Sequence, residues 1–190
     1  IFLSGKRIYV AESGQPRVQF FTQKGVFLGK LPRPGDAPNL LMEPAAVAVN
    51  SQGEIFVADN EKKKIVVFSA NNQFMYEIGA ALESPEAFTE FMDLAVDVDD
   101  NLYVLAGTND NRQSVHIYKG KQRLFRFANY STKEQSALQN AKSLTLTPKQ
   151  KTSIAIFDED KGAMHNFHYI KVPSKVAGVK ITGDVDSAKL

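Results

Sequence analysis

The sequence predicts an all-β fold in which small four-stranded antiparallel sheets are stacked side by side. The first observation is a near repeat: Ile8-Tyr9-Val10-Ala11 returns 47 residues later as Ile55-Phe56-Val57-Ala58, and after another 47 as Leu102-Tyr103-Val104-Leu105. The second is the alternation of apolar and polar residues within each copy, interrupted by short turn segments. A unit of this length cannot bury its own apolar faces and must pack against its neighbours, which is the organisation of a β-propeller.

The second copy shows the four strands of one unit, or blade. Turn-forming residues separate the strands, and four antiparallel strands are what a propeller blade contains. The predicted strands are 46–50, 54–59, 64–69 and 73–78, and the turns between them are 51–53, 60–63 and 70–72.

The other copies keep the same order of strands. Segment 17–21 matches 64–68 at the same spacing, 115–118 takes that place in the third copy after a three-residue insertion, and 164–167 takes it in the fourth. The chain is therefore predicted to form one partial propeller domain. Its expected blades are 1–31, 44–79, 92–128 and 141–172, with the start of a fifth at 176–190 and its opening strand at 176–181.

The second copy resembles the NHL repeat, whose units form the blades of propellers that usually have six. The resemblance rests on segments 44–49, 53–59, 65–68 and 74–79. The third copy departs from the pattern, with Leu105-Ala106 in place of the Ala-Asp ending, and the fourth is degenerate. This resemblance implies the fold but says little about function, because one propeller architecture supports many unrelated activities.

Four blades do not close a six-bladed ring. We therefore expect the 190 residues to be part of a longer polypeptide, or a partner to complete the ring, because open sheet edges favour aggregation. A closed four-bladed propeller is the alternative, since the smallest propellers have that number of blades.

The composition is that of an ordinary globular protein. Hydrophobic residues make up 43% and charged residues 23%, and no apolar run is long enough to span a membrane. The absence of cysteine excludes disulfides and thiolate metal sites in these residues, and fits the periplasm or cell surface as well as the cytosol. Resemblance to exported bacterial propellers favours an extracytoplasmic location.

The positive charge is small and scattered, which makes nucleic acid an unexpected partner. The net charge is +2, and the tight basic groups are 62–64 and 119–123. These groups are read as solvated hairpin turns, with phosphate contact as the alternative.

A binding site is expected on the loops that follow the second and fourth strands of each blade. Segments 31–43, 80–91 and 129–140 are much longer than a hairpin needs, and binding residues concentrate on such loops. Helices are predicted to begin at Ser84 and at Ser131. The candidate partner-binding residues are Arg33, Asp36, Lys62, Lys63, Phe88, Phe91, Asn109, Arg112 and Lys133.

Two of these candidates have a structural alternative. Phe88 and Phe91 either pack their predicted helix onto the blades or form an exposed patch for a partner.

Residues that could perform catalysis or bind metal are few. His116, His165 and His168 are the three histidines, and we interpret them as structural or surface residues. Asp97, Asp99 and Asn101 have the alternate spacing of a calcium loop. However, Leu102 stands where such a loop needs glycine, so a hairpin turn is the simpler interpretation. The resemblance to the NHL repeat implies that Asp59, the aspartate that ends its strand, braces the loop after the strand. No catalytic residue and no cofactor is predicted.

Three functions remain open from the sequence. The favoured one is a non-catalytic scaffold that binds a protein partner through its loops. The second is an enzyme of the lactonase or amidating-lyase kind, which the fold resembles, with metal ligands partly in other blades. The third is RNA binding, as in some NHL proteins. The small and scattered positive charge argues against this function.

Overall fold

The computed structural model describes most of the chain. The described residues are 1–190 without 13, 34, 38–39, 110–111, 128–137, 139, 148–152, 160–161, 170–180 and 185–190. The regular secondary structure of these residues is β-strand. No helix among them is long and apolar enough to cross a bilayer.

The strands form four antiparallel sheets of four strands each, as the repeat predicts. Sheet 1 contains β1 (Phe2–Ser4), β2 (Arg7–Ala11), β3 (Val18–Thr22) and β4 (Phe27–Leu31). Sheet 2 contains β5 (Pro44–Val49), β6 (Ile55–Asp59), β7 (Lys64–Phe68) and β8 (Phe74–Ile78). Sheet 3 contains β9 (Phe88–Val96), β10 (Leu102–Thr108), β11 (Arg112–Lys119) and β12 (Gln122–Phe127). Sheet 4 contains β13 (Ala141–Thr147), β14 (Ser153–Asp158), β15 (Ala163–Tyr169) and β16 (Ile181–Asp184).

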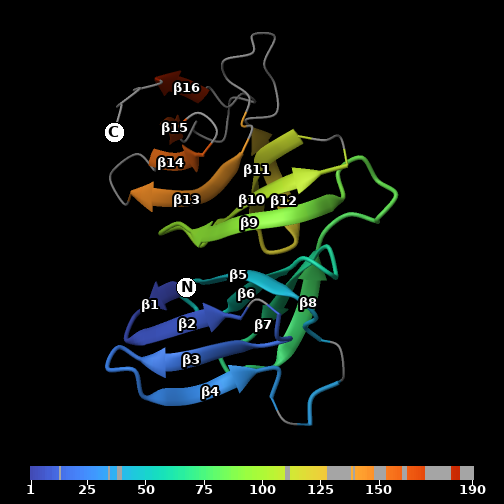
Figure 1. Ribbon diagram of the computed structural model, residues 1–190, viewed down its shortest axis with the longest axis vertical. Coiled ribbons are helices and arrows are strands. Elements are labelled where there is room, and N and C mark those ends of the chain that lie inside the picture. Colours follow the sequence, from blue (N-terminus) through green and yellow to red (C-terminus); the bar gives the residue numbers. More distant parts are fainter. Residues whose placement is uncertain are drawn as a thin grey trace.

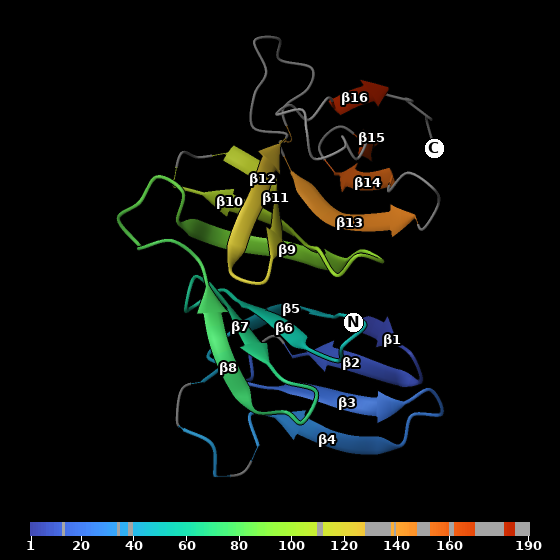
Figure 2. The same cartoon turned by 180° about the vertical axis from the view of Figure 1, so that it is seen from behind.

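Successive sheets pack on one another through their first strands. Strand β5 contacts β9, and β9 contacts β13, while β1 and β2 contact β5 (Figures 1 and 2). Each sheet keeps its strands in chain order, and strands that follow one another in a sheet pair antiparallel. This is the radial stacking of propeller blades, and among the described residues the first and fourth sheets each contact one neighbouring sheet.

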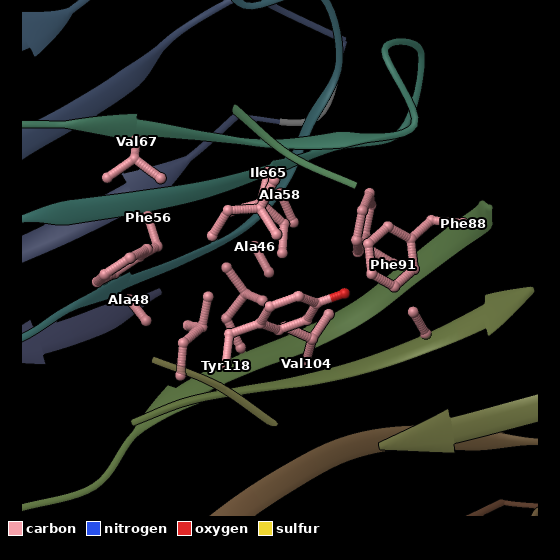
Figure 3. Close-up of a cluster of buried hydrophobic side chains, with 14 residues drawn as sticks. Ala46, Ala48, Phe56, Ala58, Ile65, Val67, Phe88, Phe91, Val104 and Tyr118 are labelled. Carbon is pink, nitrogen blue, oxygen red and sulfur yellow. The ribbon is translucent and has the colours of Figure 1, made fainter. Parts of the chain in front are cut away.

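Three apolar cores fill the spaces between the sheets. The core between sheets 2 and 3 combines small residues such as Ala46 and Ala58 with the rings of Phe88, Phe91 and Tyr118 (Figure 3). Strand β6 is buried at every position, because its alternate side chains enter the cores on both of its faces. That explains why its sequence is nearly all apolar rather than alternating.

Left-handed backbone recurs at equivalent turn positions. Gly25 (φ 80°) in the β3–β4 turn and Asn72 (φ 62°) in the β7–β8 turn adopt it at positions 47 residues apart. In the β6–β7 and β14–β15 turns it is adopted by Lys63 and Gly162, both with φ 54°. The repeat therefore preserves turn geometry even where the residue is no longer the glycine that such geometry favours.

Two sequence predictions about elements are wrong. The segment from Ser84 was expected to form a helix, but Phe88–Val96 is strand β9, which pairs with β10. The end of the chain was expected to open a fifth blade, but Ile181–Asp184 pairs with β15 as the fourth strand of sheet 4. Residues 176–180 and the predicted helix from Ser131 lie outside the described residues.

Candidate functional site

The connections after the second and fourth strands lie at one end of each sheet, and Asp59 organises them in sheet 2. Its buried carboxylate accepts hydrogen bonds from the backbone N–H groups of Met42 (2.6 Å), Glu43 (3.2 Å) and Lys62 (3.0 Å). The predicted brace on the following loop is confirmed, and the same side chain also holds the end of the loop that enters the sheet. One aspartate thus fixes two neighbouring loops.

The β6–β7 turn is tied to sheet 3 by two polar side chains. The Asn60 side-chain oxygen accepts a hydrogen bond from the Phe91 N–H at 2.8 Å, and the Lys63 ammonium donates to the Thr89 carbonyl at 2.6 Å. Lys62 forms an ion pair with Glu77 at 2.5 Å. The lysines predicted as partner contacts therefore also hold the loops together.

The β8–β9 loop is held from the β10–β11 turn. The Asn109 side chain donates to the carbonyls of Leu82 (2.8 Å) and Ser84 (2.9 Å), and its backbone N–H donates to Ala87. At the other side of this loop, Glu86 pairs with Arg123 at 2.8 Å. That hydrogen bond holds the pKa of the Glu86 carboxyl below its ordinary value.

Arg33 and Asp36 close a small turn in the β4–β5 loop. Asp36 accepts the Arg33 N–H at 2.7 Å and pairs with its guanidinium at 3.3 Å. Both candidates lie in the same loop, with Arg33 exposed. Arg112, the first residue of β11, is also exposed. Lys133 lies outside the described residues.

Phe88 and Phe91 do not form an exposed patch. They are 2% and 3% exposed, and their ring centroids lie 4.7 Å apart in the core between sheets 2 and 3 (Figure 3). Of the two alternatives for these rings, packing is correct, although a strand presents them rather than a helix. His116 is buried beside Phe88 and lies 3.0 Å from the Ser114 hydroxyl, in keeping with a structural histidine.

The candidate calcium residues form a hairpin turn. The Asp97 carboxylate accepts hydrogen bonds from the Asp99 N–H (2.9 Å), the Asn101 N–H (2.8 Å) and the Asn101 side chain (2.8 Å). Both of its oxygens are thus occupied by donors of its own turn, the bonding of an Asx turn. Among the described residues no group of three or more His, Cys, Asp or Glu side chains is placed to hold a metal ion.

Sequence reasoning missed a contact between the first strands of sheets 3 and 4. The Asp93 side chain in β9 accepts the backbone N–H of Leu144 in β13 at 3.0 Å. Burial raises the pKa of the Asp93 carboxyl above its ordinary value, while hydrogen bonds from Leu144 and Leu94 oppose that rise. Nothing in the local sequence distinguishes Asp93, because its partner lies 51 positions away.

The fold and its loops can now be compared with known proteins. A family model described as a 6-bladed beta-propeller matches residues 1–168. The chain belongs to this family. No curated protein matches it.

Solved structures agree on the fold. The chain is 14% identical to a streptogramin B lyase, with a TM-score of 0.63, and the match covers 97% of this chain and 53% of the lyase. It is also 14% identical to a protein of unknown function from Bacteroides caccae (TM-score 0.57, covering 86% and 54%). A functionally unknown protein from Desulfotomaculum acetoxidans DSM 771 is similar as well (14% identity, TM-score 0.60, covering 87% and 47%). The chain thus spans about half the length of these structures, and the likeness concerns the fold alone.

Proposed function

We propose that this protein is a non-catalytic propeller of the NHL type that binds a protein partner through the loops described above. The observation that carries the proposal is their bracing: Asp59, Asn60, Lys63 and Asn109 hold neighbouring loops by side-chain hydrogen bonds to backbone groups. Loops that are ordered before binding lose less conformational entropy when a partner docks, so more of the contact energy appears as affinity.

Site-specific photo-crosslinking tests this proposal. Leu82 on the β8–β9 loop is 57% exposed, and Val98 on a turn at the opposite end of the sheets is 77% exposed, so the two positions are matched in character. A photoreactive residue at position 82 of the intact polypeptide, expressed in its source cells, should yield a discrete protein adduct that the same residue at position 98 does not. Adducts at position 98 alone, or equally at both, would contradict the proposed site.

The metal-dependent enzyme is the competing function. It requires a ligand set outside the described residues, since none is present within them. Stoichiometric calcium or zinc in the purified intact polypeptide would argue against a scaffold that only binds.

We also propose that further four-stranded sheets of the same ring cover the outer face of sheet 1. One apolar residue from each strand forms a row across that face through the pairs Leu3–Ile8, Ile8–Phe21 and Phe21–Phe27. The residues 47 positions after Ile8 and Phe21 are Ile55 and Phe68, which are 1% and 0% exposed in the core against sheet 1. In a six-bladed ring each sheet is covered on both faces by neighbouring sheets, which explains why the outer face of sheet 1 carries the same apolar residues as the covered face of sheet 2.

A further inference from the structure

Departures from regular strand pairing in this protein are confined to the edges of its sheets. The middle pairs β2–β3, β6–β7, β10–β11 and β14–β15 keep an unbroken register. Every register shift among the described residues lies in a pair that includes an edge strand: β3–β4, β7–β8 and β11–β12 at the outer edge, and β5–β6, β9–β10 and β13–β14 at the inner edge. The edge strands without a shift, β1 and β16, span only three and four residues in the described part of the chain.

The outer edge is bulged at the same place in three sheets. The residue left out of the pairing is Leu28 in β4, Met75 in β8 and Leu124 in β12. Each lies three positions before the buried residue that ends its strand. The three side chains are 46%, 44% and 50% exposed, so burial of the extra side chain does not explain the bulge.

A bulge changes what an edge strand offers to other molecules. The last strand of a sheet presents backbone N–H and C=O groups that can pair with a strand of another chain. A bulge places two residues opposite one, which bends the strand and interrupts the regular spacing that a further strand needs. The first strands contact those of neighbouring sheets, whereas β4, β8 and β12 end their sheets on the other side. The outer edges are therefore the ones that most need this protection.

We infer that the bulges at Leu28, Met75 and Leu124 prevent the outer edges from pairing with strands of other molecules, above all with a second copy of this chain. Two copies of one edge strand can pair antiparallel about a twofold axis, so each outer edge is complementary to itself. Strand β4 has the greatest need, because Val26, Phe27 and Leu28 form an exposed apolar run at its start. This inference does not depend on the partner-binding proposal, because the braced loops lie at one end of the sheets and not along their outer edges.

Deletion of Leu28 in the intact polypeptide tests the inference. Its two neighbours in β4 already pair with adjacent residues of β3, so the deletion makes the ladder regular and keeps every other pair. We expect the variant to associate, with an average mass in analytical ultracentrifugation that approaches twice that of the original protein between about 1 and 100 µM. Amide hydrogen exchange in β4 should slow over the same range, because the new pairing protects its N–H groups.

Leu28→Ser is the matched control, because it also removes the exposed leucine but keeps the bulge. It should have the mass of the original protein at every concentration. Both variants expose less apolar area than the original, so hydrophobic association would not increase in either, and only regular edge pairing predicts association of the deletion variant. If the Leu28 deletion does not fold, deletion of Met75 in β8 takes its place, with Met75→Ser as its control.

Three outcomes would overturn the inference. The first is a folded deletion variant that keeps the mass of the original protein, which would mean that the bulge only shapes the sheet. The second is association without slower hydrogen exchange in the strand that carries the deletion. The third is equal association of the deletion variant and its serine control.

Discussion

Single residues in this chain show where the repeat tolerates change and where it does not. Asn72 occupies the left-handed position that Gly25 occupies in the equivalent turn 47 residues earlier. Its side-chain oxygen is buried and accepts no hydrogen bond from the residues that the structure describes. Asparagine tolerates left-handed backbone better than most residues, but a buried acceptor without a donor costs free energy.

Asn72→Gly is therefore expected to stabilise the protein. The substitution removes the unsatisfied oxygen and the left-handed strain together, which should raise the free energy of unfolding by about 1 kcal/mol. Urea denaturation of the two proteins at equal concentration measures the difference.

The matched control is Gly25→Ala in the equivalent turn. No atom lies within 4 Å of a Cβ built on Gly25, so this substitution tests only the free-energy cost of placing a side chain on left-handed backbone. It should lower the free energy of unfolding by about 1 kcal/mol. If Asn72→Gly lowers the free energy of unfolding as much as Gly25→Ala does, the left-handed backbone of Asn72 is not strained and the prediction is wrong.

At the scale of elements, neighbouring sheets are joined by polar contacts as well as by apolar cores. Asp93 in β9 carries one such contact to β13. Its folded-state pKa is raised by burial, so the folded protein binds this proton more tightly than the unfolded chain does. The linkage relation then requires stability to fall as the pH rises from the unfolded pKa of Asp93 through its folded pKa.

Asp93→Asn should remove this part of the pH dependence. The amide oxygen can still accept the Leu144 N–H, while the buried charge is lost. Relative to the original protein, the variant should therefore gain stability as the pH rises from below about 3.9, the ordinary aspartate pKa, towards neutrality. Thermal melts across that range measure the effect, with Glu61→Gln on an exposed turn as the control for losing one carboxylate. A difference that does not vary with pH would show that Asp93 is not the titrating group.

The elements also show what sequence reasoning could reach. The strands of sheet 2 were predicted to within two residues, because period-two alternation and turn residues are local signals. The segment from Ser84 was misread because a capping residue and a proline favour a helix locally, whereas pairing with β10 and burial of Phe88 and Phe91 favour a strand. Tertiary pairing outweighed local propensity there.

The site was less accessible to sequence reasoning for a related reason. Asp59 could be predicted as a brace because the resemblance to the NHL repeat implies that role, and the loop that it braces follows it directly. The contacts of Asn60 with Phe91 and of Asp93 with Leu144 join residues 31 and 51 positions apart, and no spacing rule connects them.

For the whole molecule, the unequal burial of equivalent positions is the feature that matters most. Ile55 and Phe68 are fully buried, whereas Ile8 and Phe21 in the same repeat positions are half-buried on the outer face of sheet 1. Leu3 and Phe27 on that face are exposed. Apolar rows of this kind are rare on the surface of a soluble monomer unless another surface covers them.

Ile8→Glu in the intact polypeptide tests whether a further sheet covers this face. A covered glutamate would leave an unpaired charge in an apolar interface, and we expect the free energy of unfolding to fall by about 3 kcal/mol. Val26→Glu is the matched control, because Val26 is 59% exposed in the β3–β4 turn and its substitution should change stability by no more than about 0.5 kcal/mol. Equal, small effects of both substitutions would mean that the outer face of sheet 1 meets solvent, and that the six-bladed ring is not closed across it.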